Sequence, residues 1–225
     1  MKYLVLMISC FSLMNCQAQK SLNIDLKKEL EDILFKDQIY REFIDSETSE
    51  ERKNEIARIT NLSRENLQQS AWTLINKIDA ENIIKVEKII SEFGYPGKSL
   101  VGEPANTTVF YVVQHSDKIQ KYYPLIEEAG KKGELPFKYV GMMLDRKLTS
   151  EQKPQVYGTQ LAFRMITNHK TGKQENFTYV LPIEDSKNVN KRRREAGFET
   201  TVEENARRFG IEYKEYTYEE LAEIK

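Results

Sequence analysis

The sequence predicts an α+β domain: a mostly helical body with one late β-hairpin packed against the helices. Apolar residues recur at helical spacing in most segments before Pro154. Two β-rich runs follow, "VYGTQLAFRMI" and "ENFTYVLPI", and the turn-like segment "TNHKTGKQ" separates them. Because a lone hairpin is marginal in water, it needs the helices as a packing surface, and we expect a cleft between the two.

Residues 1–18 have the pattern of an export signal. Lys2 is followed by an apolar run from Tyr3 to about Met14, and small and polar residues come next. This run is shorter than the roughly 20 apolar residues that span a bilayer. We therefore predict an exported protein of the cell envelope, with residues 19–225 as a single globular domain.

The end of this signal resembles the lipobox of bacterial lipoproteins. In "LMNC", Leu13 lies three residues before Cys16, although Asn15 stands where most lipoboxes carry Gly, Ala or Ser. The resemblance implies cleavage before Cys16, which would then be acylated, so that a lipid anchor would be the only link to the membrane. The alternative is ordinary cleavage after Ala18, which would give a periplasmic or secreted protein.

The composition argues against several classes of site. The chain has two cysteines, Cys10 and Cys16, and both lie in the signal. The predicted domain therefore has no disulfide, no cysteine nucleophile and no thiolate metal site. The formal net charge is −1 although 31% of the residues are charged, so the signs balance. This balance argues against a general attraction to nucleic acid, and no sequence motif indicates a cofactor.

The first half of the domain reads as a series of helices. One helix covers "LKKELEDILFKDQIYREFI", after which the polar stretch "DSETSEERKNE" interrupts the pattern. A second helix is expected at about 64–77. A third begins after Asp79, a plausible N-cap, and ends at Gly94 and Pro96.

The later helices follow the same logic. The segment "GEPANTTVFYVVQHSD" is compatible with a strand, but Pro104 at a first-turn position favours a buried helix. Helices follow at "DKIQKYYPLIEEAGKKGEL", which has a glycine stop, and at "LPFKYVGMMLDRKLTS", which has Pro136 near its start. After the hairpin, "SKNVNKRRREAGF" and "TVEENARRFGI" predict two short helices that each close near a glycine.

Several of these blocks carry a resemblance to a known family. In chain order they are "DQIYR", "GYPGKSLVG", "VVQHSD", "PLIEEAGKKGE", "LDR", "PQVYGTQ", "LPIED" and "NKRRREAGF". They resemble the bacterial family of unknown function DUF6624, over about residues 24–200. The resemblance points to related proteins but implies no particular reaction. Family members often have Asp where this chain has Asn190, so no carboxylate role is carried over to that position.

His115 is the candidate for acid–base catalysis. Of the two histidines, His169 lies in the predicted hairpin turn, where we expect a solvated loop residue. His115 follows Gln114 at the end of an apolar segment, and histidine titrates near neutral pH. The structural alternative is a histidine that caps a helix end or satisfies a buried hydrogen bond. No H-x-x-x-H or H-x-H spacing exists, so no metal site is predicted.

Two pairs of acidic and basic residues are further candidates. Asp37 and Arg41 stand four residues apart on one predicted helix face. They are either a simple ion pair or an arrangement in which Asp37 pins Arg41 so that it faces a pocket. In "LDR", Asp145 would orient His115 and Arg146 would bind an anion. The alternative is that both are exposed charges in the last turn of a helix.

The segment "KPQVYGTQ" has the residue types of a binding loop. If a strand begins there, Gln155, Tyr157 and Thr159 lie on one face and Gln160 lies on the other. Amide side chains both donate and accept hydrogen bonds, so they suit polar ligands. Gly158 would let a ligand or another backbone come close. The alternative is a polar network that staples the hairpin to the helices.

The basic run "KRRR" is the last candidate. Basic runs suggest nucleic acid, but export to the envelope argues against that partner. A solvated helix face is the default interpretation, from which Arg193 would turn inward to hold a phosphate or carboxylate.

Together these residues predict a polar cleft that binds a small polar or anionic ligand, with His115 as its possible catalytic group. The expected lining is Gln114, His115, Asp145, Arg146, Gln155, Tyr157 and Gln160. The alternative is a non-catalytic interaction protein of the envelope, in which the same polar blocks are structural. An open cleft at His115 would favour the first hypothesis, and a sealed, buried His115 would favour the second.

Overall fold

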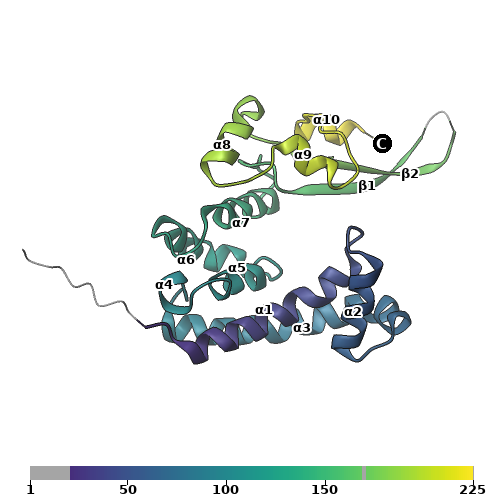
Figure 1. The fold of residues 1–225 in the computed structure, drawn as a ribbon. Helices are drawn as coiled ribbons and strands as arrows, with labels where there is room; N and C mark the ends of the chain where they lie inside the picture. Colours follow the sequence, from purple (N-terminus) through teal and green to yellow (C-terminus); the bar gives the residue numbers. More distant parts are fainter. Residues whose placement is uncertain (1–20, 169–170, 225) are drawn as a thin grey trace, which may run out of the picture.

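The structure is a computed structural model that describes residues 21–168 and 171–224. Figure 1 shows a helical body with a β-hairpin and short helices above it, which is the α+β architecture predicted from the sequence. The helices of the body are α1 (Ile24–Ile44), α2 (Glu50–Thr60), α3 (Arg64–Phe93), α4 (Lys98–Val101), the 3-10 turn η1 (Ala105–Thr107), α5 (Thr108–Val113), α6 (Ile119–Lys131) and α7 (Phe137–Ser150). The upper part contains β1 (Leu161–Thr167), β2 (Gln174–Val180), the 3-10 turn η2 (Ser186–Asn188), α8 (Val189–Glu195), α9 (Val202–Arg207) and α10 (Tyr218–Glu223).

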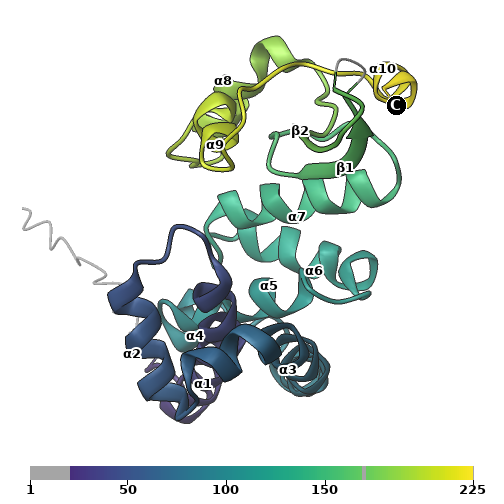
Figure 2. The ribbon, with the colours of Figure 1, turned by 90° about the vertical axis from the view of Figure 1, so that its right-hand side faces the viewer.

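The short helix α5 forms the centre of the body. It lies between the α1–α3 pair and the α6–α7 pair in both views (Figures 1 and 2). Val109 and Phe110 are fully buried there, in one cluster with Leu30 of α1 and Met143 of α7. This confirms the prediction of a buried helix after Pro104. Burial of this apolar surface supplies most of the free energy that holds the helices together.

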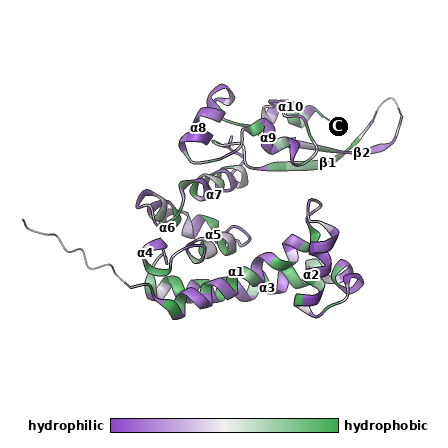
Figure 3. Cartoon of the chain, in the orientation of Figure 1, coloured by the Kyte–Doolittle hydropathy of each residue, from purple (hydrophilic) through white to green (hydrophobic). Residues whose placement is uncertain are grey.

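The helices α1 and α3 lie side by side and run in opposite directions. The Asn82 side chain of α3 donates a hydrogen bond to the backbone oxygen of Ile33 (3.4 Å), whereas Phe43, near the end of α1, clusters with Leu67, near the start of α3. Figure 3 shows hydrophobic and hydrophilic residues alternating along both helices, as expected of helices that bury one face. Across the described ranges 21–168 and 171–224, no helix is both long and apolar enough to cross a membrane.

The hairpin is antiparallel, and the end of it that is nearer to the body is packed. Leu161 pairs with Val180 at this end. Val180 is buried in a small cluster with Val189 of α8 and Val202 of α9. Figure 2 shows α7 below the two strands. The hairpin therefore has the helical support that a two-stranded sheet needs.

The predicted helix break at Asp79 is wrong. The helix α3 is continuous from the N-cap Ser63, whose hydroxyl accepts from the backbone N–H of Asn66, to the predicted stop at Gly94. Asp79 lies in the middle of this helix and its carboxylate pairs with Arg41. An aspartate before an apolar run looks like an N-cap in the sequence, but here its carboxylate forms an ion pair with Arg41 of another helix.

Three other segments differ from expectation. The polar stretch at 45–55 contains the start of α2, where the Ser49 hydroxyl accepts from the backbone N–H of Arg52 and Ile56 is the buried contact. The helix α10 has no counterpart in the predicted elements. Residues 155–160 form a loop, since β1 begins only at Leu161, so the predicted strand alternation does not apply to them.

Candidate functional site

A pocket of about 560 Å³ opens where α1, α3, α7 and the turn between α5 and α6 meet. Three of the predicted cleft residues line it: Gln114, His115 and Arg146. The other lining residues are Arg41, Ile44, Trp72, Ile75, Asn76, Asp79, Ser116 and Ile119. The pocket is thus built from α1, α3, α7, the α5–α6 turn and the start of α6, and none of its lining residues in the described ranges comes from the hairpin.

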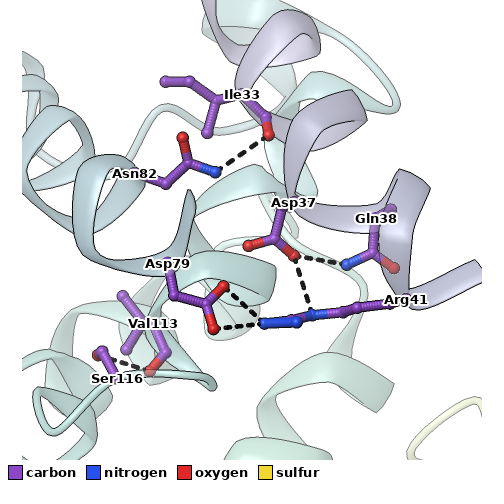
Figure 4. A network of polar contacts seen from close by, with 8 residues as sticks. All are labelled: Ile33, Asp37, Gln38, Arg41, Asp79, Asn82, Val113 and Ser116. Carbon is purple, nitrogen blue, oxygen red and sulfur yellow. Dashed lines mark hydrogen bonds and ion pairs between the residues drawn. The ribbon is translucent and has the colours of Figure 1, made fainter. Parts of the chain in front are cut away.

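Arg41 links α1 to α3 at the edge of this pocket (Figure 4). Its Nη2 donates to both carboxylate oxygens of Asp79, at 2.6 and 2.8 Å. Its Nε lies 3.8 Å from the nearer oxygen of Asp37. Asp79 is therefore the main partner of Arg41, and the predicted partner Asp37 is the weaker one.

Asp37 is a buried carboxyl group beside this ion pair. Its Oδ2 accepts a hydrogen bond of 2.6 Å from the side chain of Gln38, whereas its Oδ1 has no hydrogen-bond partner among the described residues. Burial raises the pKa of Asp37 to about 6, although the charge of Arg41 opposes the change. Burial also raises the pKa of Asp79, again against the pull of Arg41. Partial loss of hydration therefore destabilises the charged forms of both carboxylates near Arg41.

His115 lies in the turn after α5, and its backbone N–H donates to the oxygen of Val112 (3.3 Å). Burial lowers the pKa of His115 to about 3, and the positive charges of Arg41 and Arg146 lower it further. The imidazole is therefore neutral at neutral pH, with one N–H donor and one free lone pair. Within the described ranges, its side chain forms no hydrogen bond, so both ring nitrogens are available in the pocket.

Arg146 supplies the second guanidinium of the pocket. Burial lowers its pKa, and the charge of Arg41 adds to the effect, but an arginine stays protonated at any physiological pH. No carboxylate or other side chain of residues 21–168 and 171–224 bonds to its guanidinium. The positive charge of Arg146 thus has no partner in the described protein, unlike that of Arg41.

Asp145 precedes Arg146 on α7 but serves a different purpose. Its Oδ1 accepts from the backbone N–H of Val156 (2.7 Å) and Tyr157 (3.0 Å). Its Oδ2 accepts from the N–H (3.0 Å) and the hydroxyl (2.9 Å) of Thr159. The expectation that Asp145 orients His115 is therefore corrected: the carboxylate holds the 155–160 loop. Neighbouring residues of a helix point about 100° apart, which separates the two side chains.

The remaining predicted cleft residues belong to the same loop. The buried amide of Gln155 donates to the backbone oxygens of Gln160 (3.0 Å) and Leu181 (2.8 Å) and accepts from the N–H of Gln160 (2.8 Å). The ring of Tyr157 packs beside Phe198, with centroids 5.6 Å apart. The Gln160 amide donates to the Thr159 hydroxyl (3.0 Å). These contacts form the polar network between hairpin and helices that was the alternative left open by the sequence. We call residues 155–160 the staple loop.

Arg193 turns inward as expected, but it binds protein oxygens. Its guanidinium donates to the backbone oxygen of Tyr157 (2.7 Å), and to the backbone oxygen (2.7 Å) and hydroxyl (3.1 Å) of Thr200. Asn190 accepts from the N–H of Val202 (2.9 Å) and donates to the Glu203 carboxylate (2.9 Å). An aspartate at this position could not make the second bond, so the amide fits this chain's Glu203.

Gly158 has a backbone conformation in the staple loop that residues with a side chain rarely adopt. Its φ is +69°, and an added Cβ would lie 2.7 Å from side-chain atoms of Ile183 and Val202. We expect Gly158→Ala to lower the free energy of unfolding by about 2 kcal/mol, from the left-handed backbone and from overpacking. Gly172→Ala is the matched control, since φ there is +68° with open space around the Cβ. Equal losses in urea unfolding would contradict the packing part of this account.

Sequence reasoning missed two residues that shape the pocket. Asp79 was assigned to a helix end, although the apolar pattern continues through it, and its partner Arg41 is far away in the sequence. Trp72 lies in the helix expected at about 64–77 and is not among the candidate site residues, but it lines the pocket with 66% of its surface exposed. It is the only tryptophan in the chain, which was the available signal. The predicted roles of Cys16 and His169 concern residues outside the described ranges.

Within the described residues, no group of three or more His, Cys, Asp or Glu side chains is placed to hold a metal ion. The ionisable residues that line the pocket are two arginines, one aspartate and one histidine.

Comparison with known proteins identifies a family. The model of the family of unknown function DUF6624 matches residues 39–214, which include every residue that lines the pocket and the whole staple loop. No curated protein and no solved structure matches the chain. Because the family match covers most of the sequence, this chain belongs to the DUF6624 family.

Proposed function

We propose that the pocket binds a small anionic ligand and that Arg146 is its main anchor. The observation that carries the proposal is the half-buried guanidinium of Arg146, which has no carboxylate partner among the described residues while the neighbouring Arg41 is paired with Asp79. Partial burial of an unpaired positive charge is unfavourable, and a bound anion would compensate it. A carboxylate or phosphate would accept the parallel N–H bonds that a guanidinium offers.

The other pocket groups complete the recognition of such a ligand. Neutral His115 can donate one hydrogen bond and accept another, and the Gln114 amide lies beside it in the lining. The charge of Arg41 is compensated by the Asp79 carboxylate, so Arg146 supplies the uncompensated positive charge of the pocket. The cluster therefore favours a ligand with a small number of negative charges and at least one further polar group.

The catalytic form of this proposal keeps His115 as the acid–base group. With a pKa of about 3 it is a weak base in the free protein. A bound anion would offset the charges of Arg41 and Arg146, which would raise the pKa of His115 toward the range that proton transfer requires. In this form Asp145 takes no part in the chemistry, because its carboxylate is fully used by the loop.

The second candidate function is an interaction protein of the envelope. The observation that favours it is the exposed hairpin face, where Phe163 and Met165 have 74% and 60% of their surface exposed. Both candidates agree with export and with a lipid anchor at Cys16, or with a periplasmic or secreted protein if Cys16 is not acylated. Radiolabelled palmitate incorporation that depends on Cys16 would test the anchor.

The test of ligand binding uses Arg146→Ala. The fluorescence of the pocket residue Trp72, the only tryptophan, reports binding while inorganic phosphate, acetate and citrate are titrated. We expect at least one anion to bind the wild type and the variant to bind it about 10–100-fold more weakly, as for a lost charged hydrogen bond. Arg194→Ala removes an exposed arginine of α8 and should bind like wild type. Equal binding by Arg146→Ala, or no anion binding to wild type, would reject the proposal.

A further inference from the structure

The pocket has an apolar side as well as a charged one. Trp72, Ile75 and Asn76 share the lining with Asp79, and together they occupy one face of α3 because they are spaced three, four and seven residues apart. The order along this face is apolar first and polar afterwards. Trp72 and Asp79 are separated by seven residues, or about 10 Å of helix.

The helix α1 has the same polar and apolar ends on the opposite side of the pocket, although its chain direction is reversed. Arg41 pairs with Asp79, and Ile44 lies one turn further along α1. Because α1 and α3 are antiparallel, Ile44 lies toward the Trp72 end of the pocket. Both helices therefore place their polar residue at the same end of the pocket and their apolar residues at the other.

Trp72 is exposed at a position where burial was available. Its neighbour Ala71 and the next lining residue on this face, Ile75, are both buried, whereas the indole is 66% exposed at the pocket. Binding pockets are lined mainly by apolar and aromatic side chains, with a few polar groups that fix the ligand's orientation. An indole supplies a large, flat surface on which a ring can stack.

We propose that the ligand is an aryl anion: one phosphate or carboxylate group joined to an aromatic ring. The anionic group lies at Arg146, near His115 and Arg41, and the ring extends along α3 to pack on Trp72. This inference rests on the proposed function, because it takes the anion at Arg146 as one end of the ligand. It adds the chemistry of the other end.

Two pairs of probes test the ring and identify the anionic group. Binding of phenyl phosphate is compared with that of inorganic phosphate, and binding of benzoate with that of acetate, by isothermal titration calorimetry. We expect the aryl member of at least one pair to bind about 10-fold more tightly than its ring-free partner. The pair with the tighter aryl member shows whether the group is a phosphate or a carboxylate.

Trp72→Ala then separates this inference from the proposed function. The exposed indole is not part of the core, so the variant should fold, and circular dichroism checks this. We expect the ratio of aryl to ring-free affinity, measured within the variant, to fall from about 10 to about 1. Phe209→Ala, at another exposed aromatic side chain, is the control that should keep the advantage.

The outcomes are distinguishable. If aryl and ring-free anions bind wild type equally, or if the aryl advantage survives in Trp72→Ala, the aryl ligand is rejected and anion binding at Arg146 still stands. If no probe of either kind binds, the proposed function fails and this inference fails with it.

Discussion

Replacing Asp145 by alanine is expected to lower the free energy of unfolding by about 3–5 kcal/mol, because several buried donors lose their shared acceptor. The carboxylate is fully buried and accepts hydrogen bonds from the backbone N–H groups of Val156, Tyr157 and Thr159 and from the Thr159 hydroxyl. Without it, these donors remain near the protein interior with no acceptor, and each unsatisfied group costs about 1–3 kcal/mol. Urea unfolding followed by circular dichroism measures the loss.

Two further variants define the cause. Asp145→Asn keeps one oxygen but turns an N–H₂ group toward donors, so we expect a loss smaller than that of alanine and larger than 1 kcal/mol. Asp117→Ala removes a side chain that is 83% exposed and should leave stability unchanged. A loss of less than about 1 kcal/mol for Asp145→Ala would show that the loop does not depend on this carboxylate.

The second large effect is a pH dependence that Asp37 and His115 impose in opposite directions. The pKa of Asp37 is raised to about 6 from an ordinary 3.8, so between these values the folded protein holds a proton that the unfolded chain has released. Stability from this group therefore rises as the pH falls from about 6 to about 4. At pH 7 the ionised carboxylate costs the folded protein about 3 kcal/mol.

His115 acts in the reverse sense over an overlapping range. Its pKa is lowered to about 3 from an ordinary 6.5, so the unfolded chain takes up a proton that the folded protein does not. Stability from this group is present above pH 6.5 and is lost as the pH falls toward 3, by at most about 5 kcal/mol. In the wild type the two effects partly cancel between pH 4 and 6.

Two neutral substitutions separate these contributions. Relative to wild type, Asp37→Asn should be more stable by up to about 3 kcal/mol at pH 7–8, and the difference should vanish near pH 4. His115→Gln should match wild type at pH 7.5 and become progressively more stable than it below pH 6.5. Urea unfolding at pH 4.5, 5.5, 6.5 and 7.5 gives both difference curves. A difference that does not vary with pH would contradict the assignment for that residue.

The fold could be predicted where the local pattern decides the structure. The spacing of apolar residues identified α1, α6 and α7, and the glycine stop at Gly94 was correct. The hairpin was also expected, but its first strand starts later because side chains of Asp145 and Gln155 hold the backbone of the 155–160 loop. Side chains that bond to the backbone of a loop leave no periodic signal in the sequence.

The candidate site was predicted only in part, for a related reason. Gln114, His115 and Arg146 do line one pocket, but their neighbours in sequence differ from their neighbours in space. Asp145 stands next to Arg146 in the chain and faces another part of the molecule. Asp79 resembles an N-cap because it precedes an apolar run, and its partner Arg41 lies on a different helix. Pairings between distant segments decide the function of these residues, and one sequence does not display such pairings.

The helix α7 lies between the pocket and the staple loop, so these two parts of the molecule can unfold separately. Every described residue that lines the pocket lies between Arg41 and Arg146, whereas the hydrogen bonds of the staple loop begin at Asp145 and hold residues that follow it. Opening of the chain after residue 150 therefore removes no wall of the pocket. In native-state hydrogen exchange we expect the amides of the hairpin and α8 to exchange as one cooperative unit, ahead of the amides of α3 and α5. The pocket would persist through such partial unfolding, so a partner that grips or cleaves the hairpin could do so without releasing a bound ligand.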